Sequence, residues 1–229
     1  MGRAGYNIRA ALVNVRVGVK TMAQNFAKQW FENYFADFDA AQEELGELDR
    51  QLGDGDFAVN LSSALALGKK GLEPLPDDAS AEEVFHAVSQ GFLNTGGTSG
   101  PLLGMWFRDI AKAFGAENGD VSALAAGVRA GTSTIQRLGG AQAGDKTMVD
   151  AMLPAADALE KAASDGSDLA AALQAAVAGA EEGADSTADI KASLGRASYV
   201  GDVAVGLPDP GAKAIALFFE SGLKAARSA

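Results

Sequence analysis

Apolar side chains recur at three- and four-residue steps over most of this chain, which is the spacing that one face of an α-helix presents. The pattern is broadest over residues 21–47, where it consists of Phe26, Trp30, Phe31, Tyr34, Phe35 and Phe38. Ala/Leu-rich segments with similar spacing follow at about 56–69, 80–94, 100–115, 120–138, 146–164, 167–184, 186–194 and 211–227. The sequence therefore predicts an all-α fold with the aromatic stripe in its core.

Polar residues indicate where three of these helices begin. Ser80, followed by Glu83, matches the capping box, in which the two residues satisfy each other's backbone N–H groups. Asp120 and Ser167 precede two further segments and are candidate N-caps. These positions fix the expected register of the helices.

The segment VNVRV at residues 13–17 departs from the helical spacing, because its apolar residues alternate with period two. Such alternation predicts a short strand or an extended arm. We therefore expect residues 1–20 to form an N-terminal extension and residues 21–229 to form a single helical domain.

Composition excludes several classes of function. Of the 229 residues, 48% are hydrophobic and 21% are charged, as in ordinary globular domains. The net charge of −11 disfavours nucleic-acid binding, and the absence of Cys excludes disulfides and thiolate chemistry. No apolar run reaches the roughly 18 residues that a membrane span needs, and Asn14 and Arg16 interrupt the region where a signal peptide would be apolar. We expect a cytoplasmic protein that binds neither nucleic acid nor membranes.

Three carboxylates lie close together in LDRQLGDGDFAVN at residues 48–60, namely Asp49, Asp54 and Asp56. Like charges repel, and desolvation strengthens the repulsion unless a cation lies between them. Mg²⁺ prefers oxygen ligands and combines a few carboxylates with substrate phosphates and water. The cluster predicts a metal site between two helices; the alternative is a solvated acidic turn in which Asp56 caps the next helix.

Glycines gather in four places between the predicted helices, at residues 53–55, 94–104, 139–148 and 195–212. Without a Cβ, the backbone approaches a ligand closely, and a loop that leads into a helix N-terminus binds anions. Helix C-caps and tight turns also use Gly, so any single cluster is equally compatible with a structural role. Four clusters together favour a binding site.

Known phosphate and calcium signatures do not fit these clusters. Asp145 is inserted between the Gly and Lys of an otherwise P-loop-like segment at 139–147. Residues 53–58 imitate a dinucleotide fingerprint, but no strand precedes them and two aspartates stand where the pyrophosphate would lie. Ala58 and Leu65 occupy positions where an EF-hand loop requires oxygen ligands.

Four segments together resemble a known family. ELDRQLGDGDFAVN, GGTSGPLLG, GDKTMVDAMLPA and GRASYVGDVAVGLPDPGA occur in the order, and at roughly the spacing, of the nucleotide-binding L subunit of dihydroxyacetone kinase. The resemblance covers about residues 21–229. It implies an antiparallel barrel of eight helices that binds ADP or ATP at one end, and phosphoryl transfer to dihydroxyacetone or a related short ketose.

The resemblance also implies which residues form the site. Asp49, Asp54 and Asp56 would be the catalytic residues and would bind a pair of Mg²⁺ ions that bridge the nucleotide phosphates. The residues that would hold the nucleotide are Phe57, Ala58, Asn60, Gly97, Thr98, Ser99, Gly139, Thr147, Met148, Arg196, Asp209, Pro210 and Gly211. The family usually has a histidine at the position of Phe57, so one donor beside the phosphates is replaced here.

Partners are implied in the same way. In the family, a separate K subunit or domain binds the ketose covalently through a histidine, and we expect this chain to act as one subunit beside it. The nucleotide is either exchanging ATP or resident ADP that a phosphocarrier protein recharges. A homodimer is a further alternative, and a non-catalytic ADP-binding regulatory module is the alternative from another class. His86, the only histidine, is expected to be a packed or surface residue.

Overall fold

The computed structural model describes residues 8–116 and 120–228, and the side chains of residues 26–113 and 120–228. This described part contains eight α-helices and no strand, so the predicted all-α fold is confirmed. The helices are α1 (Ile8–Leu52), α2 (Phe57–Leu72), α3 (Ala81–Leu93), α4 (Ser99–Ala116), α5 (Val121–Gly139), α6 (Val149–Ser164), α7 (Leu169–Ser186) and α8 (Pro210–Ser228). Three short 3₁₀ helices, η1 (Thr187–Asp189), η2 (Arg196–Tyr199) and η3 (Gly201–Ala204), lie between α7 and α8.

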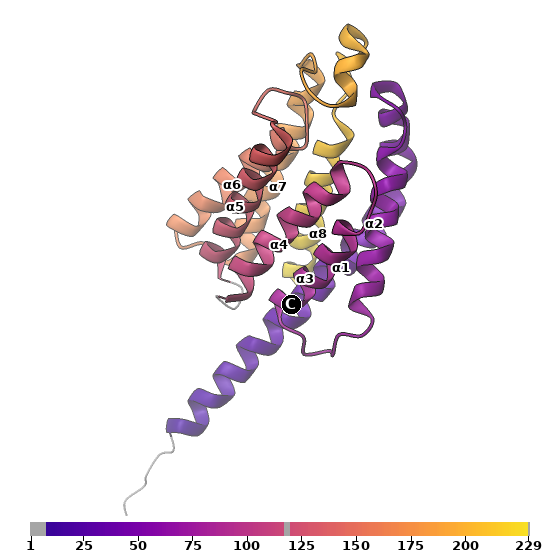
Figure 1. The fold of residues 1–229 in the computed structure, drawn as a ribbon. Coiled ribbons are helices and arrows are strands. Elements are labelled where there is room, and N and C mark those ends of the chain that lie inside the picture. Colours follow the sequence, from indigo (N-terminus) through magenta and orange to yellow (C-terminus); the bar gives the residue numbers. More distant parts are fainter. Residues whose placement is uncertain (1–7, 117–119, 229) are drawn as a thin grey trace, which may run out of the picture.

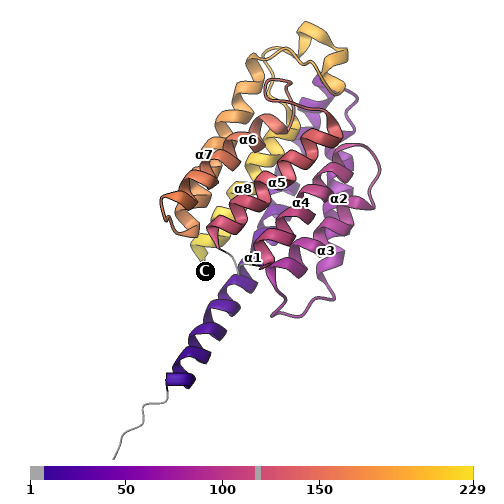
Figure 2. The same cartoon turned by 60° about the vertical axis from the view of Figure 1, so that its left-hand side comes forward.

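The helices form a closed antiparallel barrel. Each helix packs against the next one in the sequence, and α8 closes the ring by packing against α1 and α7 (Figures 1 and 2). Alternate connections therefore gather at the same end of the barrel, and the glycine-rich ones share an end. None of the described helices combines the length and the apolar character needed to cross a bilayer.

Aromatic side chains fill the centre of the barrel. The Trp30 ring stacks on Phe218 of α8 with centroids 4.6 Å apart, and its Nε1 donates a hydrogen bond of 2.7 Å to the Phe218 carbonyl. Phe31 meets Phe85 of α3 edge-on at 4.8 Å. All four residues have no exposed surface, and burying a side chain of this size contributes about 1.5–3 kcal/mol. The predicted core position of the aromatic stripe is confirmed.

Two of the three predicted N-caps are confirmed. Ser80 and Glu83 form the complete capping box, and the Asp120 carboxylate accepts the Ser122 N–H at 2.7 Å. Ser167 does not cap α7, because its N–H bonds to the Ala162 carbonyl and closes the end of α6. The N-cap is the neighbouring residue, Asp168, whose carboxylate accepts the N–H of Ala171.

The strand expected at residues 13–17 is wrong, because these residues lie within α1. The described part of the chain offers no second strand with which they could pair, and a lone strand leaves its backbone groups without partners. A helix satisfies those groups within the segment itself. Alternation over five residues is too short to outweigh the helical pattern that follows.

The helix expected at residues 186–194 is also wrong. Helix α7 ends at Ser186 and is followed by a single 3₁₀ turn, η1, and then by irregular chain. The Thr187 hydroxyl donates back to the Ala184 carbonyl at 2.5 Å, while the Thr187 carbonyl accepts a hydrogen bond from the Lys146 side chain. The same carbonyl also accepts the N–H of Ile190 at 3.3 Å, so the chain makes one 3₁₀ turn here in place of a further α-helical turn.

Candidate functional site

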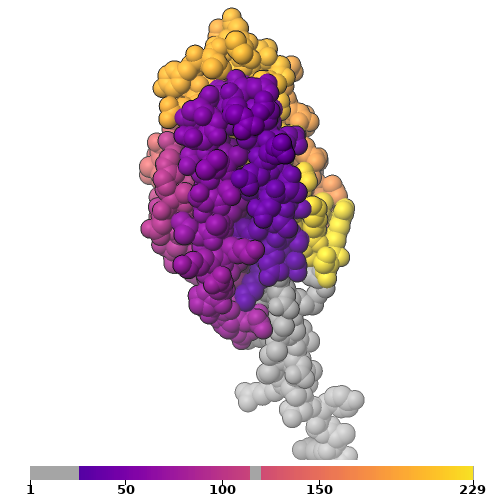
Figure 3. All heavy atoms as spheres, turned by 90° about the vertical axis from the view of Figure 1, so that its right-hand side faces the viewer, coloured from indigo at the N-terminus to yellow at the C-terminus, as the bar shows by residue number. Residues whose placement is uncertain are grey.

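The glycine-rich connections surround a cavity of about 770 Å³ at one end of the barrel. Figure 3 shows the connection between α7 and α8 as the tip of the molecule above the turn between α1 and α2. The predicted site residues that line the cavity are Asp49, Asp54, Asp56, Phe57, Asn60, Gly97, Thr98, Ser99, Gly139, Thr147, Met148, Arg196, Asp209, Pro210 and Gly211. Only Ala58 of the predicted set does not line it, because its side chain is buried in the hydrophobic core.

Asp49 joins the end of α1 to the start of α2. Its backbone carbonyl accepts the N–H of Gly53 at 2.7 Å, and its carboxylate accepts the N–H of Phe57 at 2.7 Å. The residue is 6% exposed. Burial raises the pKa of Asp49, and the negative charges of Asp54 and Asp56 add to this effect although the Phe57 hydrogen bond opposes it. A cation at this position would relieve the destabilised charge.

Asp54 and Asp56 lie on the exposed side of the same turn. The Asp54 carboxylate accepts the Asp56 N–H at 3.3 Å and forms an ion pair of 2.8 Å with Nε of Arg196, from the α7–α8 connection. Asp56 stands at the N-cap position of α2, but its side chain makes no capping hydrogen bond. The capping role that the alternative prediction gave to Asp56 is therefore wrong, whereas the solvent exposure of Asp54 and Asp56 agrees with that alternative.

The donor set suits a hard cation, although the carboxylates do not converge on one point. Within residues 26–113 and 120–228, no three acidic or histidine side chains are arranged as a ready metal site. Arg50, the nearby base in the sequence, pairs with Glu47, and Arg196 holds Asp54 instead. Asp49, Asp54, Asp56 and the Asn60 amide nevertheless line one cavity, and oxygen donors of this kind are the ligands that Mg²⁺ prefers.

The loop between α3 and α4 brings a helix N-terminus to the cavity. Gly97 has a φ of 83°, and a Cβ there would lie 3.2 Å from the side-chain amide of Asn60. Thr98 and Ser99 line the cavity where α4 begins. The first N–H groups of a helix have no partner within it, so this terminus is suited to an anion.

Two carboxylates shape the loop between α5 and α6. Asp150 accepts the N–H groups of Gly144 and Thr147, at 2.5 and 2.8 Å. Asp145 accepts the N–H of Gln142 at 2.6 Å and the hydroxyl of Ser193 from the α7–α8 connection. The loop is therefore held in one shape by its own hydrogen bonds and is tied to a neighbouring loop.

Lys146, in the same loop, is buried and points away from solvent. Its Nζ donates to the carbonyls of Thr187 at 2.5 Å and Leu207 at 2.6 Å. Burial lowers the pKa of Lys146, while the charges of Asp209 and Asp150 oppose the shift. The lysine is bound to backbone carbonyls, which agrees with the rejection of a P-loop from the sequence.

Asp209 fixes the start of α8 at the opposite wall. Its carboxylate accepts the Ala212 N–H at 2.8 Å, and its own N–H donates to the Thr187 hydroxyl at 2.8 Å. Burial raises the pKa of Asp209 to about 7, although the Ala212 hydrogen bond and the Lys146 charge act in the other direction. The cavity therefore contains a second carboxyl whose charge is destabilised.

Much of the apolar wall was missed in the sequence. The lining residues that were not predicted are Leu52, Leu102, Ile135, Ala141, Lys146, Val149, Ser193, Leu194, Gly195, Ala197, Ser198 and Tyr199. Helical spacing from the predicted positions is the signal that finds some of them. Leu102 lies three residues after Ser99 and Ile135 lies four residues before Gly139, so each shares a helix face with a predicted residue.

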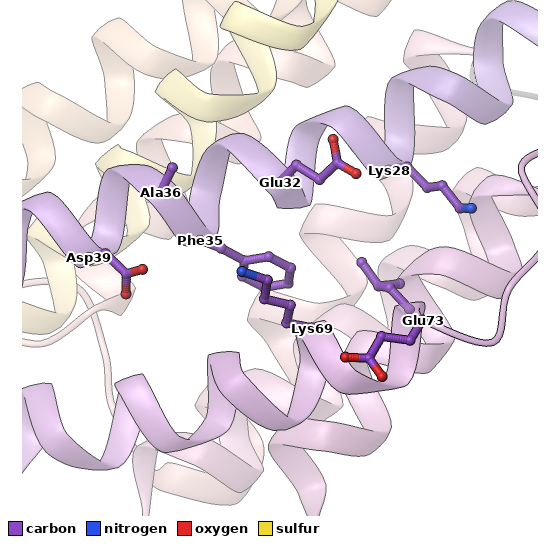
Figure 4. A pocket seen from close by; sticks show the side chains of 8 residues that line it. Lys28, Glu32, Phe35, Ala36, Asp39, Lys69 and Glu73 are labelled. Atoms are coloured by element: carbon purple, nitrogen blue, oxygen red, sulfur yellow. The ribbon is translucent and has the colours of Figure 1, made fainter.

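A second, smaller hollow of about 350 Å³ lies between α1 and α2 (Figure 4). It is lined by Lys28, Glu32, Phe35, Ala36, Asp39, Lys69, Leu72 and Glu73. Charges of both signs alternate around it, and no glycine-rich loop or helix N-terminus reaches it. The cavity at the end of the barrel is the better candidate for a functional site.

Comparisons with known proteins identify relatives of this chain. A family model described as the DAK2 domain matches residues 51–224. The chain is 32% identical over 205 residues to the ADP-binding subunit DhaL of PEP-dependent dihydroxyacetone kinase 1 from Listeria innocua, covering 89% of this chain and 98% of the relative. It is 38% identical to D-erythrulose kinase of Mycolicibacterium smegmatis, covering 77% of this chain but 31% of that enzyme.

A solved structure has the same fold. The dihydroxyacetone kinase from C. freundii in complex with AMP-PNP and Mg²⁺ superposes with a TM-score of 0.65 at 26% identity, covering 85% of this chain and 33% of that chain. The chain thus spans nearly all of the DhaL relative and about a third of the larger kinases. All of these relatives are kinases or subunits of kinases.

Proposed function

This chain belongs to the DAK2 domain family of kinases and kinase subunits, and we propose that it is the nucleotide-binding subunit of a kinase for dihydroxyacetone or a related short ketose. The observation that carries the proposal is the end cavity, where the fold gathers the acidic turn, the start of α4 and two further glycine-rich loops. The relative that the chain covers almost completely is named an ADP-binding subunit, which supports the nucleotide.

Asp49, Asp54 and Asp56 are the residues that would hold Mg²⁺. The metal would neutralise charge on the transferred phosphoryl group, while the protein holds the reactants in position. Asn60 and the N-terminus of α4 would bind phosphate oxygens. The nucleoside would lie against Thr147 and Met148 and the apolar side chains of Leu102 and Ile135.

Resident ADP is the form of the nucleotide that we favour. The relatives of similar length are the ADP-binding subunits of PEP-dependent and PTS-dependent dihydroxyacetone kinases. In such an arrangement a phosphocarrier protein recharges ADP, so the nucleotide stays bound through successive turnovers. Exchanging ATP is the alternative. Retention of ADP after dialysis, followed by phosphoryl transfer from a phosphocarrier, would distinguish the two.

The partner that we propose is a K-type subunit that carries the ketose. Exposed large apolar side chains are uncommon in the described part, and three of them, Tyr199, Val203 and Val205, lie in the connection between α7 and α8, where Tyr199 lines the cavity. Tyr199 is 82% exposed and Val203 is 70% exposed. Exposed apolar residues that gather on one face mark an interaction surface. A partner seated there would bring its ketose to the nucleotide phosphates.

Phe57 favours a second candidate, a non-catalytic ADP-binding regulatory module. The side chain lines the cavity at the start of α2 and supplies no donor at that position. If the subunit is an impaired kinase, Phe57→His should raise the phosphoryl-transfer rate by up to roughly 10²–10⁴-fold, the range for one positioned proton donor or electrostatic contact. An unchanged rate with nucleotide binding preserved would favour the regulatory module.

Calorimetric titration with Mg·ADP tests the site directly. Asp54→Ala and Asp56→Ala should each abolish Mg²⁺-dependent binding, and circular dichroism should show an intact helical fold. Asp39→Ala is the matched control, because Asp39 is an equally exposed carboxylate that lines the second hollow. Undiminished affinity in both site variants, or an equal loss in the control, would contradict the metal assignment.

An activity assay tests the subunit role. The purified chain with Mg·ATP should turn over no free dihydroxyacetone, and activity should appear when a K-type subunit is added. With a net charge of −11, association with a basic partner should weaken as ionic strength rises. Sustained phosphorylation of the free ketose by the chain alone would overturn this role.

A further inference from the structure

Lys146 combines two features that are costly in a folded protein. Its side chain is 1% exposed, and its φ is 62°, the only positive value at a non-glycine residue within the described part. A left-handed backbone is unfavourable at a residue with a Cβ, and a buried ammonium is unfavourable unless it is hydrogen-bonded. Retaining both features needs a reason beyond turn geometry, because Gly would adopt the same φ without strain.

The partners of Lys146 are the two ends of the connection between α7 and α8. Thr187 stands where this connection leaves α7, and Leu207 stands shortly before α8 begins. One Nζ atom donates to both carbonyls. A backbone hydrogen bond of 2.7 Å from the Gly206 N–H to the Ala188 carbonyl closes the neck beside it. The segment 188–206 is therefore a loop whose ends are held together, and we call it the tip loop.

The tip loop forms one wall of the nucleotide cavity. Residues 193–199 of this loop line the cavity, and among them Arg196 forms the ion pair with Asp54. Beyond its neck the tip loop has few polar anchors: the Arg196 pair, the hydroxyl and N–H of Ser193 on Asp145, and a pair between Lys191 and Asp202 within the loop. Its apolar contacts are a small cluster with Leu52 and the packing of Leu194 against the barrel core. The neck is therefore one of a few attachments that set the position of this wall.

The backbone turn that carries Lys146 is also fixed by hydrogen bonds. Asp150 accepts the backbone N–H groups of Gly144 and Thr147 on either side of Lys146, so the turn that carries the lysine is rigid. Both Lys146 and its neighbour Thr147 line the cavity, and the Lys146 ammonium donates to the carbonyls at the neck. Asp209 lies next to the same neck, because its N–H donates to the Thr187 hydroxyl.

We propose that Lys146 is a positioning residue that clamps both ends of the tip loop to the α5–α6 loop, and thereby holds Arg196 and Asp209 at the nucleotide cavity. In this role the lysine acts through two of its three N–H donors, which are used by backbone carbonyls. The expected effect of the clamp on nucleotide affinity rests on the proposed function. Its effect on hydrogen exchange in the tip loop is measured without any ligand.

Hydrogen exchange in the ligand-free protein tests the clamp. Lys146→Met keeps the apolar stem and removes the ammonium. Amide exchange within residues 190–206 should become about tenfold faster or more, as expected when hydrogen bonds from a buried charge are lost. Exchange in the barrel helices should be unchanged. Lys161→Met is the matched control, because Lys161 is a surface lysine paired with Asp165 and should alter neither region.

Two further variants separate clamping from folding. Lys146→Gly removes the clamp and also relieves the strained φ, so it should stay folded and release the tip loop even if Lys146→Met does not fold. Lys146→Arg keeps a cationic donor and should restore part of the protection. Unchanged exchange of residues 190–206 in both Lys146→Met and Lys146→Gly would overturn the proposal.

Calorimetry with Mg·ADP supplies the second readout. Lys146→Met should weaken binding about tenfold in parallel with release of the tip loop, and Lys146→Arg should recover part of the affinity. Weaker binding with a fully protected tip loop would mean that the lysine contacts the ligand, and a released loop with normal affinity would mean that it positions nothing; either result overturns the proposal. If the unmodified chain binds no Mg·ADP, the proposed function fails, and the exchange rates alone decide the clamp.

Discussion

Phe218 and Asp209 hold the same helix, α8, by different physical means. Phe218 lies in the barrel interior with no exposed surface, and its ring is 4.6 Å from Trp30, 5.1 Å from Trp106 and 5.2 Å from Phe107. Asp209 lies just before the helix, where its carboxylate accepts one N–H and its backbone donates to the Thr187 hydroxyl. The interior uses many weak contacts, and the cavity end uses a few directional ones.

The difference determines what a substitution does at each end. Contacts among aromatic rings are non-directional and numerous, so removing one ring lowers the stability of the whole barrel. At the cavity, the buried groups of Asp49 and Lys146 and the half-buried carboxyl of Asp209 are each compensated by only a few backbone groups. Substitutions there should change the position or charge of the site more than the global free energy of unfolding.

The largest effect should come from Phe218→Ala, which breaks the aromatic packing at its centre. We expect the free energy of unfolding to fall by about 3–5 kcal/mol, the usual cost of removing a buried Phe ring. Urea unfolding measures this, with Leu67→Ala as the control because Leu67 is 41% exposed on α2. The affinity of the folded fraction for Mg·ADP should be unchanged. A decrease of less than about 1 kcal/mol in the free energy of unfolding would contradict the role of this ring.

Glycines have different roles in the barrel interior and in the loops at the cavity end. At Gly222, a Cβ would lie 2.4 Å from the Trp30 ring, so this glycine lets α8 approach α1. Gly222→Ala should destabilise the protein by about 1–3 kcal/mol through overpacking. Gly96→Ala, in the loop before α4, meets no atom within 4 Å and should change stability by less than about 0.5 kcal/mol. Thermal unfolding of both variants checks this; equal shifts would remove the distinction.

The interior was largely readable from the sequence because helical periodicity is a local signal. Aromatic spacing in α1 identified the core face, and the Ser80 capping box identified the start of α3. The errors were also local in origin. Five alternating residues at 13–17 were too few to specify a strand, and Ser167 was assigned to α7 although its N–H closes α6.

The cavity was predictable only in part, because its members meet through the fold. Glycines and aspartates in four segments identified its loops, and the fold brings those loops to one cavity. The pair of Arg196 with Asp54 joins segments far apart in the chain, so the spacing of residues in the sequence does not reveal it. Lys146 was left without a role, since its partners are backbone carbonyls, which no residue pattern reveals.

At the cavity end, Asp209 should make a smaller contribution to the free energy of unfolding, and this contribution should depend on pH. The folded protein keeps a proton on this carboxyl up to a pKa of about 7, whereas the unfolded chain loses it near the ordinary value of 3.8. The folded state thus binds more protons between these pH values, and its stability contribution falls as pH rises through that window. Asp209→Asn removes this titration and, since Asn also caps helices, keeps the Ala212 hydrogen bond.

The free energy of unfolding of Asp209→Asn relative to the unmodified protein should therefore increase from pH 4 to pH 7 and stay level above it. We expect a change of about 1–2 kcal/mol, because one pKa unit corresponds to about 1.4 kcal/mol and the residue is only half-buried. Urea unfolding at several pH values, with chelator present, measures the difference. A constant difference between Asp209→Asn and the unmodified protein across this pH range would contradict the raised pKa of Asp209.

The smallest effect should come from Ser80→Ala at the start of α3. This substitution removes directional hydrogen bonds that lie away from the cavity. The Ser80 hydroxyl accepts the Glu83 N–H at 3.2 Å, and the Glu83 carboxylate accepts the Ser80 N–H at 2.7 Å. Loss of this cap should cost about 1 kcal/mol, and Ser80→Asp should retain most of the stability. Because Ser80 does not line the cavity, Mg·ADP affinity should be unaffected. A change in affinity larger than the change in unfolding free energy would mean that the two ends of the barrel are coupled and that directional bonds at either end control the site.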